Sequence, residues 1–148
     1  MNIVENLPIL IDHHPDHQAV NAELVKHIKS KTQPYNGKEI DEWVTSLITK
    51  FEFDAGYNIQ YTNGWLARYD EGDHIDSHNH HLYHLSYIYF VKAPEGSSPL
   101  VFTTSGQEIE AEEGKIVIFP GWMYHHVPYC KVSGRMVRVG NAYIHINN

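Results

Sequence analysis

The sequence lacks the features that would place the protein in a membrane or in an oxidising compartment. It has one cysteine in 148 residues, so no disulfide can form within the chain, and such a sequence fits a reducing compartment. No apolar stretch approaches the length of a bilayer span, and the start MNIVENLPIL lacks the basic residues of a signal peptide. We therefore expect a cytoplasmic protein with no membrane partner, in which Cys130 is an ordinary packed thiol.

Positive charge is also scarce. The 11 lysines and arginines face 18 acidic residues, which gives a net charge of -7, and the basic residues form no run. This balance disfavours nucleic acid and anionic membrane surfaces as partners.

The length predicts a single domain, residues 1–148, with one hydrophobic core. Its first part, 1–56, is predicted to be helical after a short apolar strand or arm over 2–11. Proline and an acid suit the first turn of a helix, and apolar residues at four-residue spacing extend this helix over 15–30, up to the loop TQPYNG. A second helix is predicted over 38–53, where apolar residues recur on one face: Ile40, Trp43, Val44, Leu47, Ile48 and Phe51.

The remaining part, 57–148, has the pattern of short strands. Seven segments rich in Val, Ile, Tyr and Phe are separated by glycine- or proline-containing turns, among them a turn at Asn63-Gly64. This spacing predicts seven or eight strands in an antiparallel sandwich or jelly roll, covered by the two helices. The segments are NIQYT, WLARY, HLSYIYFV, LVFTT, QEIEA, KIVIFP and MVRVGNAYIHI.

A histidine-rich stretch precedes one of these strands. Side chains alternate along an extended segment, so His78 and His80 in the sequence H-N-H should face the same way and share one metal ion. A third ligand can come from His125 or His126, but alternation allows only one of these two to face the metal. The strands must curl into a small barrel to bring the three together.

The order of these residues resembles that of the iron- and 2-oxoglutarate-dependent oxygenases, which have a double-stranded β-helix (jelly-roll) core. The chain is most similar to small bacterial or phage oxygenases with an H-x-H motif. The resemblance covers residues 65–141 and rests on ordered spacings: Gly72 six residues before His78, Ser86 six after His80, Phe119-Pro120 ahead of His125, Arg135 ten after His125, and Asn141 six after Arg135.

The resemblance implies a dioxygenase that needs Fe(II), 2-oxoglutarate and O2. Its metal ligands would be His78, His80 and His125, and the cosubstrate would be held by Arg135 and Asn141. A guanidinium suits the far carboxylate of 2-oxoglutarate because its planar fork gives two parallel charge-assisted hydrogen bonds. The implied reaction hydroxylates a small molecule or a protein side chain while 2-oxoglutarate is decarboxylated to succinate.

The chain departs from most relatives by lacking a carboxylate two residues after the first histidine. His74-Ile75-Asp76 is an alternative H-x-D four residues earlier, but the Gly72 and Ser86 spacings favour the later pair. A similar choice concerns Arg135 and Arg138. They are three apart in one strand and face opposite sides, so only one enters the barrel, and the family spacing selects Arg135.

Two other functions remain open at this point. A cupin-type metalloenzyme also has a glycine six residues before H-x-H, and Gly114, Pro120 and His125 fit its second motif. Its usual glutamate after H-x-H is absent, and a cupin gives no reason for Arg135. The third hypothesis is a jelly roll that binds a metal or ligand without catalysis.

Overall fold

Most of the chain forms strands, with two helices near its start. The structure is a computed structural model, and it describes residues 9–50 and 57–146. In this part no helix is long and apolar enough to cross a membrane. The elements are β1 (Leu10–His13), α1 (His17–His27), β2 (Thr32–Pro34), α2 (Lys38–Lys50), β3 (Tyr57–Tyr69), β4 (Ile75–His78), β5 (Leu85–Lys92), β6 (Leu100–Phe102), β7 (Gln107–Ile109), β8 (Lys115–Pro120), β9 (His125–Val127) and β10 (Arg135–Ile146).

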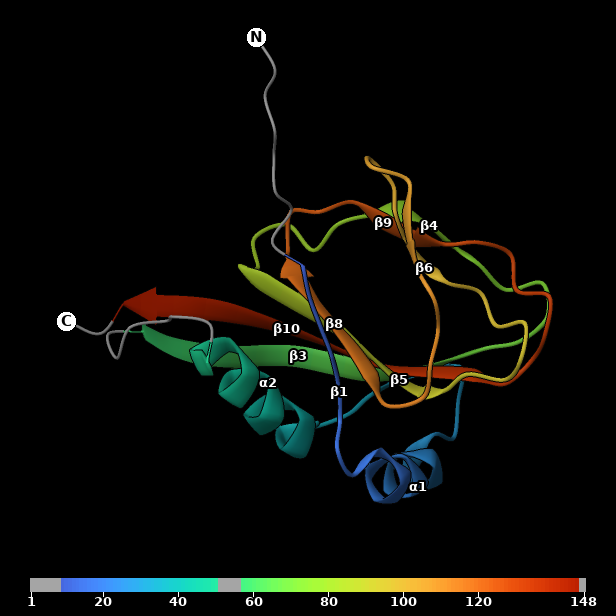
Figure 1. Cartoon of the computed structure of the whole chain (residues 1–148), viewed down its shortest axis with the longest axis horizontal. Helices are drawn as coiled ribbons and strands as arrows, with labels where there is room; N and C mark the ends of the chain where they lie inside the picture. Colours follow the sequence, from blue (N-terminus) through green and yellow to red (C-terminus); the bar gives the residue numbers. More distant parts are fainter. Residues whose placement is uncertain (1–8, 51–56, 147–148) are drawn as a thin grey trace, which may run out of the picture.

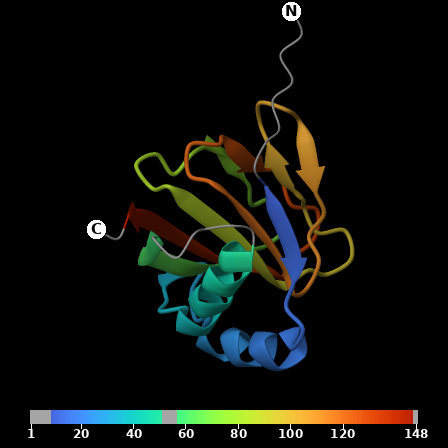
Figure 2. The same ribbon diagram turned by 60° about the vertical axis from the view of Figure 1, so that its left-hand side comes forward.

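The strands form two antiparallel sheets that face each other. The large sheet has the order β1-β8-β5-β10-β3-β2, and the small sheet has the order β4-β9-β6-β7. Both helices lie against the face of the large sheet that points away from the small sheet (Figures 1 and 2). The predicted jelly roll with two covering helices is therefore confirmed.

A hydrophobic core fills the space between the sheets. It depends on the period of two in β5, β8 and β10, because alternate residues of these strands point toward the small sheet. Phe102 and Phe119 meet there edge to face, with ring centroids 5.2 Å apart. The other buried members include Ile88, Phe90, Leu100, Val117, Val137 and Val139.

A second core lies between the large sheet and the helices. Helix α2 contributes its predicted apolar face, in which Ile40 and Val44 are each 1% exposed. The prediction 38–53 matches α2 up to Lys50, and 51–53 lie outside the described residues. The first helix is shorter than the predicted 15–30, since Ile28 is extended and the side chain of Gln33 binds the backbone N–H groups of Lys29 and Ser30.

The predicted turn at Asn63-Gly64 is wrong. These residues lie inside β3, which runs unbroken for 13 residues beside β10. The pairing register shifts between Gly140 and Ala142, so Asn141 faces a β-bulge in β3. The Asn-Gly pair is typical of a hairpin turn, but the chain does not reverse here. Asn63 lies in the bulge, and Gly64 leaves space for the large side chain of Arg138 from the neighbouring strand.

The N-terminal part also contributes strands to the sheet. Residues 32–34 of the predicted loop TQPYNG form the edge strand β2, which pairs with β3, and β1 pairs with β8. A polar edge strand of three residues is too short to show a periodic pattern in the sequence, and it forms because it pairs with β3. Of the predicted strand over 2–11, residues 2–8 lie outside the described part, and β1 extends to His13.

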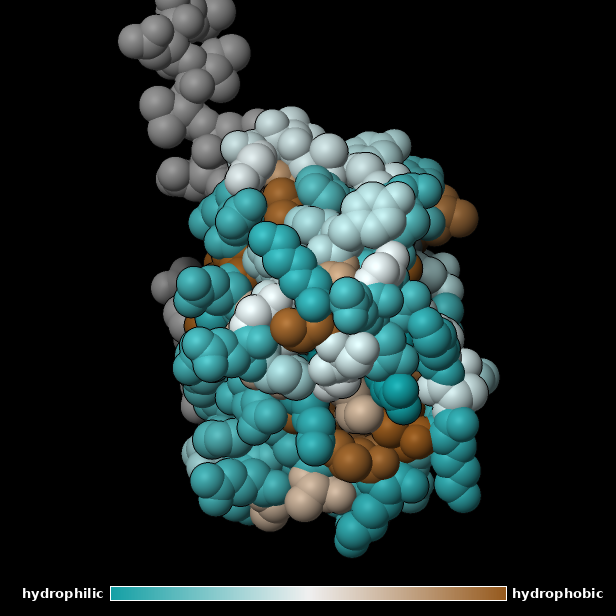
Figure 3. Space-filling model, turned by 90° about the vertical axis from the view of Figure 1, so that its right-hand side faces the viewer, coloured by the Kyte–Doolittle hydropathy of each residue, from teal (hydrophilic) through white to brown (hydrophobic). Residues whose placement is uncertain are grey.

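The end of the sandwich that lies on the right in Figure 1 is formed by the loops after β3, β5 and β9. Its surface is mostly hydrophilic, and hydrophobic residues occur there only in small groups (Figure 3). The described residues visible at this end of the sandwich therefore form no broad apolar surface that would indicate a docking site.

Substitution of Gly140 tests how β10 packs against the core between the large sheet and the helices. A Cβ atom at this position would overlap the ring of Tyr87, which is 2% exposed and is held by a hydrogen bond from its hydroxyl to Asp41. We expect Gly140→Ala to lower the free energy of unfolding by about 1–3 kcal/mol, as overpacking does. Urea unfolding measures this change.

The matched control is Asn58→Ala, an exposed position on the neighbouring strand β3, which should change stability by less than about 0.5 kcal/mol. A Gly140→Ala protein as stable as the wild type would contradict the packing of Tyr87 described here.

Candidate metal centre

Three histidines from distant parts of the chain meet at one end of the barrel. His78 ends β4 and His125 begins β9, and the two residues are paired across these strands. His80 follows in the loop that leads back to β5, where its backbone N–H donates to the carbonyl of Gly121 at 2.8 Å. The strand pairing and this loop contact place all three imidazoles on the inner side of the small sheet.

The geometry suits a shared metal ion. One nitrogen from each of the three imidazoles lies within 4.8 Å of the other two. The rings of His78 and His125 have centroids 4.4 Å apart, and the rings of His80 and His125 are stacked with centroids 5.1 Å apart. Three nitrogens at this separation can bind one face of a transition metal such as Fe(II), and imidazole is a suitable donor for it.

Hydrogen bonds fix the orientation of two of the rings. The Nδ1–H of His78 donates to the carbonyl of Asp76 at 2.9 Å, and the Nδ1–H of His125 donates to the carbonyl of Met123 at 3.0 Å. In this tautomer Nε2 carries a lone pair, which is the form that ligates a metal. The backbone therefore prepares both imidazoles to bind.

His80 is positioned by an aromatic neighbour. The indole of Trp65, from β3, stacks on the imidazole with the ring centroids 5.9 Å apart and the planes 11° apart. No sequence signal connected Trp65 with His80. The contact arises because Trp65 faces inward from β3, directly beside β10.

Burial keeps two of the three imidazoles neutral. It lowers the pKa of His80 to about 4, with a further lowering from His78 and an opposing effect of Asn141. It lowers the pKa of His125 to about 4 as well, against the opposing hydrogen bond to Met123. A metal competes with protons for these nitrogens, so both sites remain available well below neutral pH.

The alternative pair His74/Asp76 does not join the cluster. The Asp76 carboxylate is 94% exposed and lies 3.2 Å from Nε2 of His74, while the His74 ring packs on Tyr129. The register predicted from Gly72 and Ser86 thus brings the later pair to His125. In the described residues, the group of side chains suited to a metal is this one, and it contains no carboxylate.

The other histidines near the cluster make separate contacts. His126 points away from His125, as alternation along β9 requires, and its Nδ1 lies 2.8 Å from the hydroxyl of Thr103. The Nδ1 of His84 accepts a hydrogen bond from the backbone N–H of Ile144. His81 is exposed.

Arg135 enters the barrel from the first position of β10. It is 1% exposed, and its Nε donates to the carbonyl of Ser98 at 2.8 Å. Nη1 and Nη2 have no hydrogen-bond partner among the described residues. The guanidinium carbon lies 4.7 Å from the ring centroid of Tyr69 and 5.2 Å from that of Phe90, and burial lowers the pKa of Arg135. A buried cation with two free donors matches an anionic group such as a carboxylate.

Asn141 lies in the middle of the same strand. Its Oδ1 accepts from the hydroxyl of Ser86 at 2.7 Å, and its Nδ2 donates to Oδ1 of Asn63 at 3.1 Å. These contacts and its effect on the pKa of His80 place Asn141 beside the histidine cluster. Its predicted role in holding the cosubstrate stays a prediction.

Comparisons with known proteins identify the fold. No protein-family model and no curated protein matches the sequence, but solved structures match nearly its whole length. A viral collagen prolyl hydroxylase from Paramecium Bursaria Chlorella virus-1 aligns with a TM-score of 0.68 and 14% identity, over 96% of this chain and 98% of the other. A prolyl-4-hydroxylase from Pseudomonas putida aligns with a TM-score of 0.69 and 14% identity, over 93% and 92%.

The fold is that of the Fe(II)- and 2-oxoglutarate-dependent oxygenases. A third structure with this fold, HygX from Streptomyces hygroscopicus with nickel and 2-oxoglutarate bound, aligns with a TM-score of 0.66 and 10% identity, over 93% of this chain and 82% of the other. The resemblance drawn from residue spacing thus agrees with an independent comparison of the oxygenase fold in three dimensions.

The buried histidines make the stability of the metal-free protein depend on pH. In the folded state His125 stays neutral down to a pKa of about 4, whereas the usual value is 6.5. Between these values the unfolded chain binds the extra proton, so the free energy of unfolding falls as the pH falls. The loss for His125 is about 3 kcal/mol on going from pH 6.5 to 4, and no loss from it occurs above 6.5.

Urea unfolding at several pH values measures this dependence. We expect a shallower slope in His125→Asn and the wild-type slope in the control His81→Asn, which removes an exposed histidine. A wild-type slope in His125→Asn would show that this histidine is not held neutral by burial.

Proposed function

We propose that the protein is an Fe(II)- and 2-oxoglutarate-dependent dioxygenase. The observation that carries this proposal is the presence, inside one jelly roll, of three convergent imidazoles and a buried guanidinium with two free donors. The first group fits a divalent metal and the second fits a carboxylate. Both face the interior of the same barrel, as a metal-chelating dicarboxylate requires.

The ligands that we assign to Fe(II) are His78, His80 and His125. Their donors are all neutral, so a bound Fe(II) ion keeps its full positive charge, unlike a site with one carboxylate. When bound, Fe(II) and 2-oxoglutarate supply the oxidising chemistry that inserts one oxygen atom of O2 into a C–H bond and the other into succinate.

The chain itself orients the reactants and excludes water. Arg135 and Tyr69 form an interior end wall at which the far carboxylate of the cosubstrate can be held. Phe90 and its neighbours between the sheets provide an apolar lining, which strengthens the ion pair with Arg135 by lowering the local dielectric. Asn141 and Trp65 hold His80 in place at the other end.

For the substrate we propose a small molecule or a protein side chain. The net charge of -7 disfavours nucleic acid. The neighbouring prolyl hydroxylases support the hydroxylation of an aliphatic carbon, though at 14% identity they do not specify which substrate. We also propose a cytoplasmic location, in agreement with the free, buried thiol of Cys130.

The cupin-type enzyme and the non-catalytic jelly roll remain the rival functions. Both account for the histidines. Neither function needs a buried cation in the barrel that has two donors without a hydrogen-bond partner among the described residues. Burying such a cation is costly unless an anionic ligand compensates for its charge. Arg135 therefore decides between these functions experimentally.

The first test concerns the metal ligands. We expect His78→Ala and His125→Ala to weaken Fe(II) binding by more than the roughly ten- to hundredfold loss typical of residues behind the ligands. Titration with Fe(II) under anaerobic conditions, monitored by calorimetry, measures the affinity. The matched controls are His74→Ala and Asp76→Ala, which should bind Fe(II) like the wild type; loss of binding in Asp76→Ala with full binding in His78→Ala would reverse the assignment.

The second test concerns the cosubstrate. If Arg135 holds the far carboxylate, Arg135→Met should leave Fe(II) binding nearly intact and weaken 2-oxoglutarate binding, because a buried charge loses its partner. The expected cost is about 2–5 kcal/mol, or roughly thirtyfold to several thousandfold in affinity. The assay measures succinate formed from 2-oxoglutarate by the Fe(II) protein in air.

The control for this test is Arg68→Met, which removes an arginine that lies on the surface and pairs with Asp70. It should turn over 2-oxoglutarate like the wild type. If the wild-type protein binds Fe(II) but not 2-oxoglutarate, the oxygenase function is excluded and the cupin or binding function replaces it.

A further inference from the structure

A second buried arginine lies on the opposite face of the large sheet. Arg138 is three residues from Arg135 in β10 and points toward the helices, so the expected opposite orientation of the two arginines is confirmed. It is 2% exposed. Its Nε and Nη1 have no hydrogen-bond partner among the described residues, and its Nη2 lies 3.9 Å from Oδ1 of Asp41, beyond hydrogen-bond distance.

The protein makes space for this guanidinium with two glycines. A Cβ atom on Gly37 or on Gly64 would overlap the guanidinium group. Gly37 directly precedes α2 and Gly64 lies at the bulge of β3, so the side chain is enclosed between two backbones from different elements. Neither glycine has a positive φ. Glycine is therefore needed at these two positions because Arg138 approaches the backbone closely, and not because a turn requires it.

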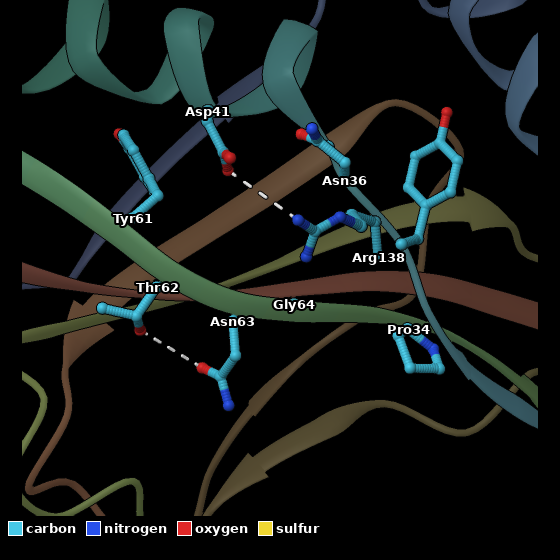
Figure 4. Close-up of a pocket in the computed structure, with 10 residues that line it drawn as sticks. Pro34, Asn36, Asp41, Tyr61, Thr62, Asn63, Gly64 and Arg138 are labelled. Carbon is cyan, nitrogen blue, oxygen red and sulfur yellow. Dashed lines mark hydrogen bonds and ion pairs between the residues drawn. The ribbon is translucent and has the colours of Figure 1, made fainter.

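The guanidinium forms one wall of a pocket. This pocket has a volume of about 560 Å³, within the range of sites for small organic ligands. Figure 4 shows Arg138 between Asn36 and Gly64, with Asp41 and Tyr61 on the side of α2 and Asn63 on the side of β3. The full lining is Pro34, Tyr35, Asn36, Gly37, Asp41, Tyr61, Thr62, Asn63, Gly64 and Arg138.

Asp41 only partly compensates for the charge of Arg138. Its Oδ1 accepts a hydrogen bond from the hydroxyl of Tyr87 at 2.5 Å, so this oxygen is already engaged. Burial raises the pKa of Asp41, against the lowering effects of Tyr87 and Arg138. The pair is therefore a loose contact in which the cation has spare donors and the anion is held elsewhere.

We propose that this pocket is a second ligand site, which binds a small organic monocarboxylate through Arg138. A carboxylate matches the planar guanidinium, and the spare donors of Arg138 would then be compensated. Tyr35, Tyr61 and Pro34 supply apolar walls for a ring or short carbon chain. Asn36 offers a partner for a hydroxyl or carbonyl group on that body, whereas the side chains of Asn63 and Thr62 are already hydrogen-bonded to Asn141.

Asp41 makes a monoanion the better fit. A phosphate monoester carries up to two negative charges, and it would lie close to this carboxylate in a partly buried site, where like charges repel strongly. Arg138 lies on the opposite face of β10 from Arg135, and the pocket lining reaches the side of the histidine cluster through the hydrogen bond between Asn63 and Asn141. Binding of a carboxylate through Arg138 does not depend on the proposed oxygenase activity.

The probe for this site is 4-hydroxybenzoate, a ring with one carboxylate and one hydroxyl. The metal-free full chain is titrated with this probe while the amide chemical shifts are recorded. We expect the largest shifts at Asn36, Gly37, Asn63 and Gly64. Arg138→Met should weaken binding by about thirtyfold or more, because the carboxylate loses its buried cation. Arg68→Met, which removes an exposed arginine paired with Asp70, should bind the probe like the wild type.

A second variant guards against misfolding of Arg138→Met. Asn36 is exposed, so Asn36→Asp retains the fold while adding a negative charge to the pocket, and we expect weaker binding of the probe. Phenyl phosphate forms the other arm and should bind more weakly than the carboxylate. The proposal is overturned if the wild type shows no binding at about 10 mM probe, if shifts occur instead on the inner face, if Asn36→Asp has no effect, or if the phosphate binds better.

Discussion

The pairing of β4 with β9 is the contact on which the candidate metal centre depends. It sets His78 directly opposite His125, two residues that are far apart in the chain. In an antiparallel pair a slip of one residue would turn one of these imidazoles to the outer face. The small sheet therefore needs a fixed register, and the backbone carbonyls of Asp76 and Met123 then fix the tautomer of each ring.

Strand β10 directs two buried arginines to opposite faces of the large sheet by the alternation of its side chains. Among the residues that face inward, Arg135 is at the start of the strand and Asn141 is in its middle, so a single strand contacts both the surroundings of Arg135 and the histidine cluster. Arg138 points to the helices instead. The strand lies between β5 and β3 in the large sheet, and this central position buries both arginines.

Two buried guanidinium groups in one strand are costly for a protein of this size. Each has donors without a hydrogen-bond partner in the described part of the chain, and burying an uncompensated cation opposes folding by several kcal/mol. Neighbouring aromatic rings offset part of this cost, with Tyr69 and Phe90 beside Arg135 and Tyr87 beside Arg138. An anionic ligand at either site would offset more, so binding and stability should be linked.

The sequence by itself determined the features that follow from local periodicity and spacing. The apolar face of α2 and the strands after Tyr57 were predictable, because side-chain alternation and helix period act over a few residues. The opposite orientation of Arg135 and Arg138 followed from the same rule. The set of His78, His80 and His125 came instead from the family spacing, since alternation left His125 and His126 open and His80 lies in a loop after β4.

Tertiary structure alone decided the features that depend on a distant partner. Asn63-Gly64 reads locally as a turn, but pairing with β10 keeps β3 extended, and Arg138 fills the space that the glycine leaves. The edge strand β2 forms only because β3 offers free backbone groups. Trp65 stacks on His80, and a pocket surrounds Arg138, because packing brings together residues whose spacing in the chain carries no common signal.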